Sequence, residues 1–548
     1  MRCKLNGPSC SQRLFMAFAL WCMLGSLWLP CLSAGTPDAD IQVGLDLERE
    51  RRWSEAVKHY EESLRRHREA PSLEQRLQIA RVHYDVDRRY RDRSFQATLD
   101  ELSAGQALDL YTEVLANIES HYVDTPNWAQ LQRHGTAFLE VALLDENFRQ
   151  RHLRGVDPEL IEAFRLDVHH HAERRVPQSR QDLRVTASLI ADLAADRLQL
   201  PRTATILEYV CGAIGLLDPY TRFLTGDQLD DTFSNIEGNF VGLGVEIKAQ
   251  QDALEIVSVI GGGPAAEIGI RGGDRILAVD KTRVADVEPD YAADLLRGPE
   301  GSPVLIELLT AAGEPRELSV VRRRVDVPSI ENAHIIDVDH GVAYCRLTSF
   351  QRSTCDDMDR ALWQMHRKGM QTLILDLRGN PGGLLPAAVE VADRFLNQGR
   401  IVSTRGRNTR ENFDYVAHRP GTWNVPLLVL VDDHSASASE IFAGAIRDHE
   451  RGILFGSQTY GKGSVQGIFQ LHTLHAGLCL TTAKFYSPKG QAISQRGVQP
   501  HHAVATDAEH TVLRPDPGRL DQVPTDPVVA AALQYAREQI RISERSAP

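Results

Sequence analysis

Three serines lie in the turn between an expected strand and the helix expected after it. An apolar run of strand length, Val425–Val431, comes before them, and apolar residues at helical spacing follow from Ile441. Ser435, Ser437 and Ser439 therefore lie at a helix N-terminus. Main-chain N–H groups lack intrahelical partners there and the helix dipole is positive, so an oxyanion would find donors. The turn is therefore a candidate position for a serine nucleophile.

A second interpretation of this turn needs no catalysis. Ser437 and Glu440 have the spacing of a capping box, in which the serine caps the helix and the glutamate reaches back. One helix start can serve both purposes. The spacing alone does not choose among the three serines.

A glycine-rich turn precedes the serines in the chain. Arg378–Gly383 lies between an expected buried strand, Thr372–Leu377, and an expected helix, Leu384–Leu396. Glycines there let the main chain approach a ligand and expose its N–H groups, although a tight turn alone would also explain them.

A lysine follows the serines in a second glycine-rich stretch. Gly456 and Gly461-Lys462 have nearly the spacing of a phosphate-binding P-loop, but Gly463 stands where that loop needs Ser or Thr, and a strand-like alternation follows. We therefore expect no nucleotide. In a strand, Lys462, Ser464 and Gln466 share one face. A lysine can take a serine proton only when neutral, and burial favours that form.

Between the expected helical region and this α/β block, short β-type runs alternate with glycine turns. The Gly242-Leu243-Gly244-Val245 stretch, the Pro264-Ala265 pair and the Gly273-Asp274-Arg275-Ile276 run follow the order of a PDZ domain. The series resembles that domain over 237–325. Such a domain adds an extended peptide to a sheet edge while loop N–H groups hold the terminal carboxylate, so Gly242–Val245 are the expected peptide-binding residues.

The N-terminal third has other signals. Arg2, Lys4 and Arg13 precede an apolar run from Leu14 to Leu29 and small residues, which is the layout of a secretory signal. We expect a protein outside the cytoplasm, periplasmic after signal cleavage, with a retained membrane anchor as the alternative. Residues 40–92 have nearly the spacing of one tetratricopeptide repeat. A helical pattern then continues from Leu108 to Phe223.

Composition excludes several classes of function. The 548 residues carry a formal net charge of -13, which offers no general attraction to nucleic acid. His169–His171 cannot all face one ion from a helix, and the cysteines outside the signal match no zinc pattern. We expect no metal and no cofactor.

Several further motifs complete a family pattern. These are Leu217-Asp-Pro-Tyr-Thr-Arg-Phe-Leu224, Asp376-Leu-Arg-Gly-Asn-Pro-Gly-Gly383, Ser435-Ala-Ser-Ala-Ser-Glu-Ile441, Gly461-Lys-Gly-Ser-Val-Gln466 and Leu480-Thr-Thr-Ala-Lys484. In this order, over roughly 108–505, the chain resembles the carboxyl-terminal processing, or tail-specific, proteases.

The resemblance implies a Ser-Lys serine endopeptidase that acts on unstructured protein C-termini. Ser437 would be the nucleophile, Lys462 the general base and Gln466 the residue that orients the lysine. The N–H of Ala438 with that of Gly382 or, more in keeping with the pattern, Gly383 would form the oxyanion hole. As a separate hypothesis, Arg297 in Leu296-Arg-Gly298 helps to couple PDZ occupancy to the catalytic state. A non-catalytic PDZ and helical scaffold for envelope proteins is the alternative function.

The expected fold is a multidomain α+β protein with a helical N-terminal region, a β-rich PDZ domain and a crotonase-like α/β protease core. Family habit also suggests a homo-oligomer. The expected segments are a signal peptide (1–35), a tetratricopeptide-like hairpin (40–92), a helical platform (93–236), the PDZ domain (237–325), the protease core (326–505) and a C-terminal tail with a helix (506–548).

Overall fold

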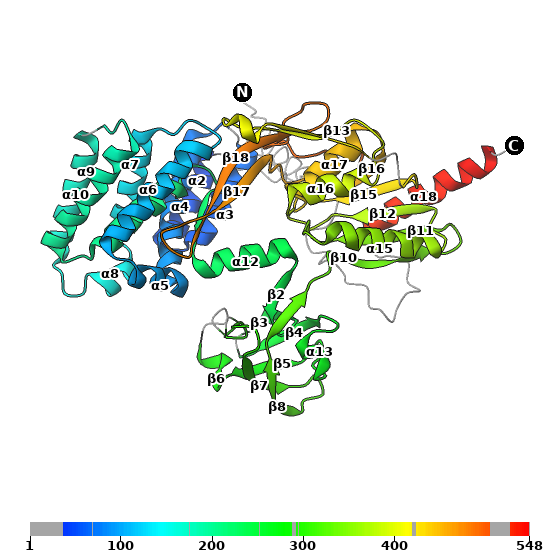
Figure 1. The fold of residues 1–548 in the computed structure, drawn as a ribbon, viewed down its shortest axis with the longest axis horizontal. Helices are drawn as coiled ribbons and strands as arrows, with labels where there is room; N and C mark the ends of the chain where they lie inside the picture. Colours follow the sequence, from blue (N-terminus) through cyan, green and yellow to red (C-terminus); the bar gives the residue numbers. More distant parts are fainter. Residues whose placement is uncertain are drawn as a thin grey trace, which may run out of the picture. The chain divides into compact units, whose positions relative to one another are not determined.

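A computed structural model describes most of the chain (Figure 1). The described residues are 37–67, 69–174, 176–250, 252–287, 292–293, 295–418, 423–504 and 526–546. The expected signal peptide, residues 1–35, lies outside them. None of the helices in the described ranges is long and apolar enough to cross a membrane. The fold mixes helices and sheets, in agreement with the multidomain α+β prediction, and divides into two compact units, 1–91 with 141–151 and 92–140 with 152–548.

The first unit is helical. It is built mainly from α2 (Pro37–Arg49), α3 (Trp53–Arg66) and α4 (Pro71–Arg91). A Cβ atom on Gly44 of α2 would lie 2.1 Å from the buried ring of Tyr60 on α3, so only glycine allows the two helices to pack this closely. The segment expected to be a tetratricopeptide-like hairpin, residues 40–92, contains three helices among its described residues, and α4 packs against α2 and α3.

The second unit begins with more helices. They are α5 (Arg93–Glu101), α6 (Ala104–His121), α7 (Trp128–Ala142), α9 (Pro158–Arg174), α10 (Arg180–Leu198) and α11 (Arg202–Gly215); the short α8 (Glu146–His152) lies mostly in the first unit. A Cβ atom on Gly212 would lie 2.6 Å from Cα of Gly135, which shows how closely α7 and α11 approach. The helical run ends at Gly215 rather than at Phe223, which lies in strand β1 (Arg222–Leu224). Helix α12 (Gly226–Glu237) follows.

A β-rich domain follows α12. A two-stranded ribbon of β2 (Asn239–Gly242) and β9 (Arg323–Asp326) leads into and out of it. Its sheet has the order β3-β4-β5-β7-β8, and β6 pairs with β5. The strands are β3 (Val245–Ala249), β4 (Leu254–Val259), β5 (Arg275–Val279), β6 (Thr282–Arg283), β7 (Pro303–Leu309) and β8 (Pro315–Val321), joined in part by α13 (Pro264–Glu267) and the 3-10 turn Val284–Asp286. Among the described strands, β3 pairs with β4 alone, so its other side is a sheet edge there.

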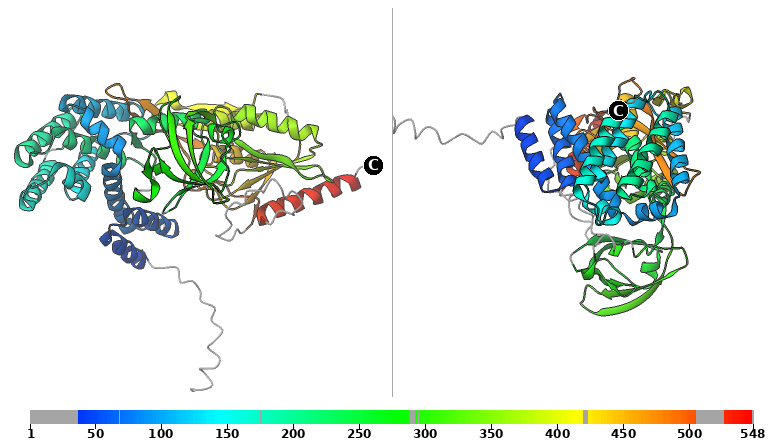
Figure 2. Two further views of the ribbon diagram at one scale, coloured as in Figure 1. Left: turned by 90° about the horizontal axis from the view of Figure 1, so that it is seen from below. Right: turned by 90° about the vertical axis from the view of Figure 1, so that its left-hand side faces the viewer.

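The α/β block is centred on a six-stranded sheet of order β10-β11-β12-β15-β16-β19, parallel from β11 onward. Its strands are Ile330–Asp337, Val342–Leu347, Thr372–Asp376, Leu427–Val431, Gly452–Gly456 and His502–Ala503. Helices α15 (Thr354–Arg367), α16 (Leu385–Asp393) and α17 (Ala438–Asp448) cover one face. The last helix, α18 (Pro527–Ser546), covers the other (Figure 2).

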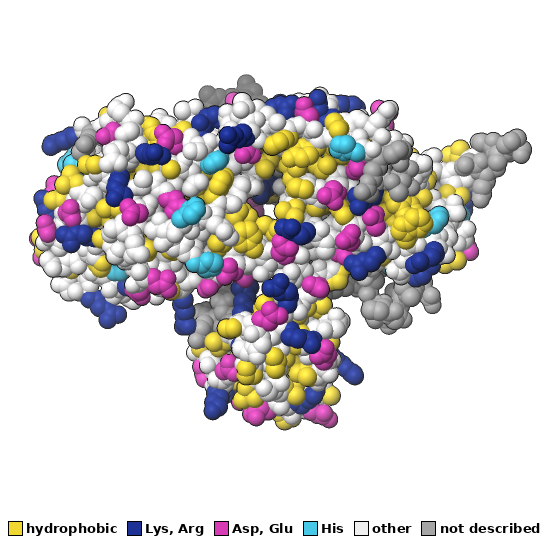
Figure 3. Space-filling view, viewed as in Figure 1, with side chains coloured by type: hydrophobic (Ala, Val, Ile, Leu, Met, Phe, Trp, Pro, Cys, Tyr) yellow, Lys and Arg dark blue, Asp and Glu magenta, His cyan; other side chains and the backbone are white. Residues whose placement is uncertain are grey.

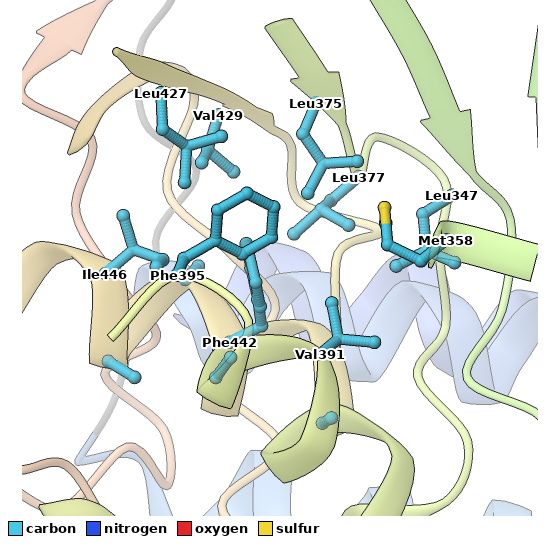
Figure 4. Packing of buried hydrophobic residues seen from close by; sticks show 14 of the residues in the cluster. Leu347, Met358, Leu375, Leu377, Val391, Phe395, Leu427, Val429, Phe442 and Ile446 are labelled. Atoms are coloured by element: carbon cyan, nitrogen blue, oxygen red, sulfur yellow. The ribbon is translucent and has the colours of Figure 1, made fainter. Parts of the chain in front are cut away.

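Alternation along the strands explains why both faces are covered. In β15, Leu427 and Val429 pack toward α16 and α17, whereas Leu428 and Leu430 pack toward α18. Figure 4 shows the first face, where Phe395 and Phe442 lie against strand residues. Phe442 is fully buried, and its truncation to alanine would cost about 3–5 kcal/mol. This core fixes the strand ends that carry the glycine and serine turns.

A second sheet completes the unit. It has the order β1-β18-β13-β14, and β17 also pairs with β18. The additional strands are β13 (Arg400–Arg405), β14 (Phe413–Val416), β17 (Ser464–Gln470) and β18 (Gly477–Tyr486). The alternating residues after Lys462 thus form a strand, as expected. Because β1 pairs antiparallel with β18, it brings the 217–224 segment beside the lysine-bearing region.

Candidate active site

The serine turn lies at the carboxyl end of β15. Ser437 is the N-cap residue of α17 and pairs with Glu440 in a capping box. Its φ of +55° and ψ of -111° place a non-glycine residue in a sparsely populated backbone region. Strain of this kind costs about 1–3 kcal/mol and is typical of functional turns between a strand and a helix.

The structure separates the three serines. Ser435 and Ser439 are fully buried, and their hydroxyls donate to the carbonyls of Leu377 (2.8 Å) and Asn380 (3.0 Å). Ser437 is half-buried, and within the described ranges its hydroxyl donates to no other group. Ser435 and Ser439 therefore hold the turn together, whereas the Ser437 hydroxyl is available for chemistry.

The glycine turn lies directly against Ser437. A Cβ atom on Gly382 would lie 2.9 Å from both the Ser437 Cβ and the Ala438 nitrogen, so a side chain there would collide with the serine turn. The N–H of Gly382 donates to Oδ1 of Asn380 (2.8 Å). This bond occupies the Gly382 donor, so among the expected oxyanion donors the geometry favours Gly383 together with Ala438.

Asn380 ties the two turns together. It is fully buried, its amide nitrogen donates to the carbonyl of Leu347 (2.8 Å), and its own carbonyl accepts from the N–H of Ala436 (3.0 Å) and the hydroxyl of Ser439. Asp432 adds a second link, because its carboxylate accepts the N–H of Gly379 at 3.0 and 3.1 Å. The glycine and serine turns are thus one hydrogen-bonded body.

Glu440 connects the serine turn to the lysine turn. Its carboxylate is fully buried and accepts four hydrogen bonds. Oε2 accepts the N–H of Ser437 and of Lys462, each at 2.8 Å; Oε1 accepts the hydroxyl of Thr459 and the N–H of Gly461, each at 2.6 Å. Burial raises the pKa of Glu440, while these four bonds act in the opposite direction. One carboxylate therefore holds the main chain of both expected dyad residues.

Lys462 lies in a half-buried position just before β17. Its Nζ atom stands 4.8 Å from the centroid of the Tyr220 ring. Burial lowers the pKa of Lys462 below its ordinary value. The charge of Arg222 acts in the same direction, and Cys479, Glu440 and Asp218 oppose it. The lysine is thus closer to its neutral form than a solvated lysine would be.

Gln466 lies on β17 beside the lysine turn. Its amide nitrogen donates to the hydroxyls of Ser464 (2.9 Å) and Thr481 (3.5 Å). Thr481 in turn donates to Asp218 (2.9 Å). The side chain is therefore anchored to neighbouring strand residues, and its expected role in orienting Lys462 stays a prediction.

Sequence reasoning missed two contributors to this site. The sequence assigns Glu440 only a capping role, because spacing within a helix reports only local partners. Tyr220 lies within a quoted motif, but no role followed from it. The signal that could have pointed to Tyr220 is Asp218, which has the position of a turn-forming aspartate followed by a proline.

The expected PDZ residues lie at the start of the β3 edge. Gly242, Leu243 and Gly244 are buried; the carbonyls of Leu243 and Gly244 accept the N–H groups of Ala265 and Ile260, each at 2.9 Å, and Gly244 has a φ of +76°. Val245 opens β3. The exposed Arg297 donates to the carboxylate of Asp231 on α12 at 2.7 Å.

One group of candidate metal ligands occurs among the described residues: Asp432, Asp433 and His434 at the serine turn. Asp432 already accepts the N–H groups of Gly379, His434 and Ser435, which gives it a structural purpose. His169 on α9 pairs with Glu140 at 2.9 Å and Glu173 at 3.5 Å.

Surface charge agrees with the composition. On the face shown in Figure 3, basic and acidic side chains are interspersed.

Comparison with known proteins identifies two parts of the chain. Residues 341–504 match the family model Peptidase family S41, and residues 255–310 match the PDZ domain. A carboxy-terminal-processing protease of Bartonella bacilliformis is 36% identical over 295 residues, which cover 53% of this chain and 67% of the relative. A carboxyl-terminal-processing protease of Synechocystis is 36% identical over 293 residues, which cover 52% and 68%.

A solved structure, the photosystem II D1 C-terminal processing protease, aligns with 73% of this chain and 93% of its own at 25% identity and a TM-score of 0.39. The coverage and identity of the two sequence relatives decide the assignment. The chain belongs to the carboxyl-terminal-processing proteases, a family of serine-type peptidases, and carries a PDZ domain.

Proposed function

We propose that this protein is a serine endopeptidase that cleaves unstructured C-terminal regions of proteins, with Ser437 as nucleophile and Lys462 as general base. The observation that carries the proposal is the Glu440 carboxylate, which accepts the N–H groups of both residues at 2.8 Å. Burying a carboxylate and a lysine amine and holding a strained serine turn all cost folding free energy. A catalytic role for the two residues would explain why the protein maintains this arrangement.

The chemistry follows from these groups. Neutral Lys462 accepts the Ser437 proton while Oγ attacks the peptide carbonyl, and the N–H groups of Ala438 and Gly383 stabilise the oxyanion. The intermediate collapses, the peptide C–N bond breaks, and the ammonium of Lys462 returns its proton to the leaving amine. Water then attacks the acyl-enzyme with Lys462 again as base, which releases the acid and restores the serine. Gln466, which lies on β17 beside the lysine turn, would help to orient the lysine side chain.

The experiment uses an unstructured polypeptide that ends in apolar residues. Wild type should cleave it, whereas Ser437→Ala and Lys462→Ala should lose at least about 10³-fold in kcat. Lys489→Ala is a matched control, since Lys489 is exposed. Cleavage by both dyad variants at the wild-type rate would refute the mechanism. Binding of the polypeptide with no cleavage by wild type would favour the scaffold alternative.

For the PDZ domain, we propose that the substrate C-terminus adds to the open edge of β3 and that Gly242–Val245 hold its carboxylate. Arg297 would transmit occupancy through its ion pair with Asp231 on α12. Arg297→Ala should reduce activation by a C-terminal peptide and leave cleavage of a tail-free substrate intact. If both rates stay at the wild-type level, Arg297 has no such role.

We also propose an extracytoplasmic location, periplasmic in a cell with two membranes, on the basis of the expected signal at 1–35. N-terminal sequencing of the protein from fractionated cells tests this, because a retained leader in the membrane fraction would indicate an anchor instead. Self-association through the helical regions is a further proposal, tested by light scattering.

A further inference from the structure

Tyr220 is the aromatic neighbour of the lysine amine. Nζ of Lys462 stands 4.8 Å from the ring centroid, within the range of a cation–π contact. The ring is half-buried, and the Tyr220 hydroxyl is hydrogen-bonded to the side chain of Tyr460, the residue two positions before Lys462. The contact between the two hydroxyls thus links the Tyr220 turn to the turn that carries Lys462.

The Tyr220 turn is firmly held. The carboxylate of Asp218 accepts the N–H groups of Tyr220 (2.9 Å) and Thr221 (3.1 Å) and the hydroxyl of Thr221 (2.6 Å). It also accepts the hydroxyl of Thr481 on β18 at 2.9 Å. Since Thr481 contacts Gln466, the turn is linked to the strand that follows Lys462. A ring carried on so fixed a turn can set the position of a flexible side chain.

Two effects of the ring on the lysine oppose each other. The face of the ring attracts an ammonium. The same ring excludes water from the amine, and loss of hydration can shift a lysine by several pKa units. Burial is the leading influence on the Lys462 pKa and lowers it. The half-buried Tyr220 ring, 4.8 Å from the amine, is one of the groups that can shield the amine from water, and where that effect is the larger one the ring favours a lysine that can accept a proton.

We propose that Tyr220 is a positioning residue, whose ring holds the Lys462 amine toward Ser437 and shields it from water. The inference rests on the proposed function in one respect, that Lys462 is the base. The hydroxyl of Tyr220 is secondary, because it points to Tyr460. Other charged or titratable groups near the amine are Arg222, Asp218, Glu440 and Cys479, and the test variants leave all of them in place.

The test compares Tyr220→Phe with Tyr220→Ala in full-length protein. We measure kcat/KM against pH and, separately, the pH dependence of reductive methylation of Lys462 by mass spectrometry in a Ser437→Ala background. Phenylalanine keeps the ring, so both profiles should stay within a few tenths of a pH unit of wild type. Alanine admits water, so both midpoints should move upward by about one unit, with about tenfold lower activity at neutral pH.

Tyr415→Ala, which removes another half-buried tyrosine, is the matched control and should not move either midpoint. If Tyr220→Ala fails to fold in thermal denaturation, Tyr220→Leu replaces it and should shift the midpoints in the same direction. Unchanged midpoints in the alanine or leucine variant, or equal losses in the phenylalanine variant, would overturn the inference. Full activity of Lys462→Ala would instead refute the proposed base, whatever the methylation midpoints show.

Discussion

Replacement of Glu440 by glutamine tests whether one carboxylate organises the site. All four groups that face its oxygens are donors, three main-chain N–H groups and the hydroxyl of Thr459. The hydroxyl oxygen of Thr459 also accepts the N–H of Val498 at 2.7 Å. Among these four groups, a protonated Glu440 would find an acceptor for its acid proton only in this hydroxyl, which already accepts that N–H. The arrangement therefore fits an ionised Glu440, and an amide must turn its NH2 group toward at least one donor.

The less costly orientation places the NH2 group near Thr459 and Gly461. The hydroxyl can rotate to accept, but the N–H of Gly461 loses its partner, at a cost of about 1–3 kcal/mol. Ser437 and Lys462 keep an acceptor, although a neutral one, which weakens each bond by about 1 kcal/mol. Because glutamine is neutral, the folded protein no longer carries the cost of burying a charge, and this offsets part of the loss in the free energy of unfolding. If the transition state loses about 1–3 kcal/mol of stabilisation relative to the bound substrate, kcat decreases about 5- to 150-fold.

The pH profile should change in a defined direction. The Glu440 charge stabilises the ammonium of Lys462, so its removal should lower the lysine pKa and move the acidic limb of kcat/KM to lower pH. This shift is opposite to the one expected for Tyr220→Ala. The assay is cleavage of an unstructured substrate from pH 5 to pH 10, with the exposed Glu331→Gln as the matched control. A Glu440→Gln enzyme with wild-type kcat and an unmoved limb would refute this account of the site.

Three further predictions concern neighbouring groups. Ser435→Ala should cost about 1–3 kcal/mol of stability by thermal denaturation, because it deprives buried groups of a partner, yet it should retain cleavage that Ser437→Ala loses. Asn380→Ala should release the Gly382 N–H and decrease kcat about 10- to 100-fold with little change in KM, as steady-state kinetics would show. Lys462→Met should stabilise the inactive protein, since the folded-state pKa of Lys462 lies below its ordinary 10.5. The gain should be largest below the folded pKa and shrink toward pH 10.5; a gain independent of pH in denaturant titrations would contradict that.

Local features of the site could be predicted from the sequence. Apolar spacing placed the handover from strand to helix at the serines, and the alternation after Lys462 indicated a strand; β15, α17 and β17 are found there. A continuous apolar run predicted a buried parallel strand, and β12 is buried on both faces. These features depend on neighbours within a few residues, which a pattern can report.

Long-range partners could not be predicted in this way. Glu440 meets Lys462 because β15 and β16 pair in parallel and bring the turns after them together. Tyr220 reaches the lysine because β1 pairs with β18, a partner more than two hundred residues away. The family motif alone selects Ser437 among the three serines; the hydroxyl bonds of Ser435 and Ser439 in the structure support that prediction, and they too depend on distant partners.

The ribbon of β2 and β9 bears on how the PDZ domain could have been inserted into this chain during evolution. Asn239 and Asp326 are paired neighbours, and the N–H of Val327 donates to the carbonyl of Gly238 at 2.8 Å, so the chain leaves and returns at one point. A segment whose ends already meet can be gained, lost or exchanged in one genetic event with little disturbance to the remaining fold. The PDZ domain is thus a separable insertion, and joining 238 to 327 by a short turn should yield a protease sheet that still folds.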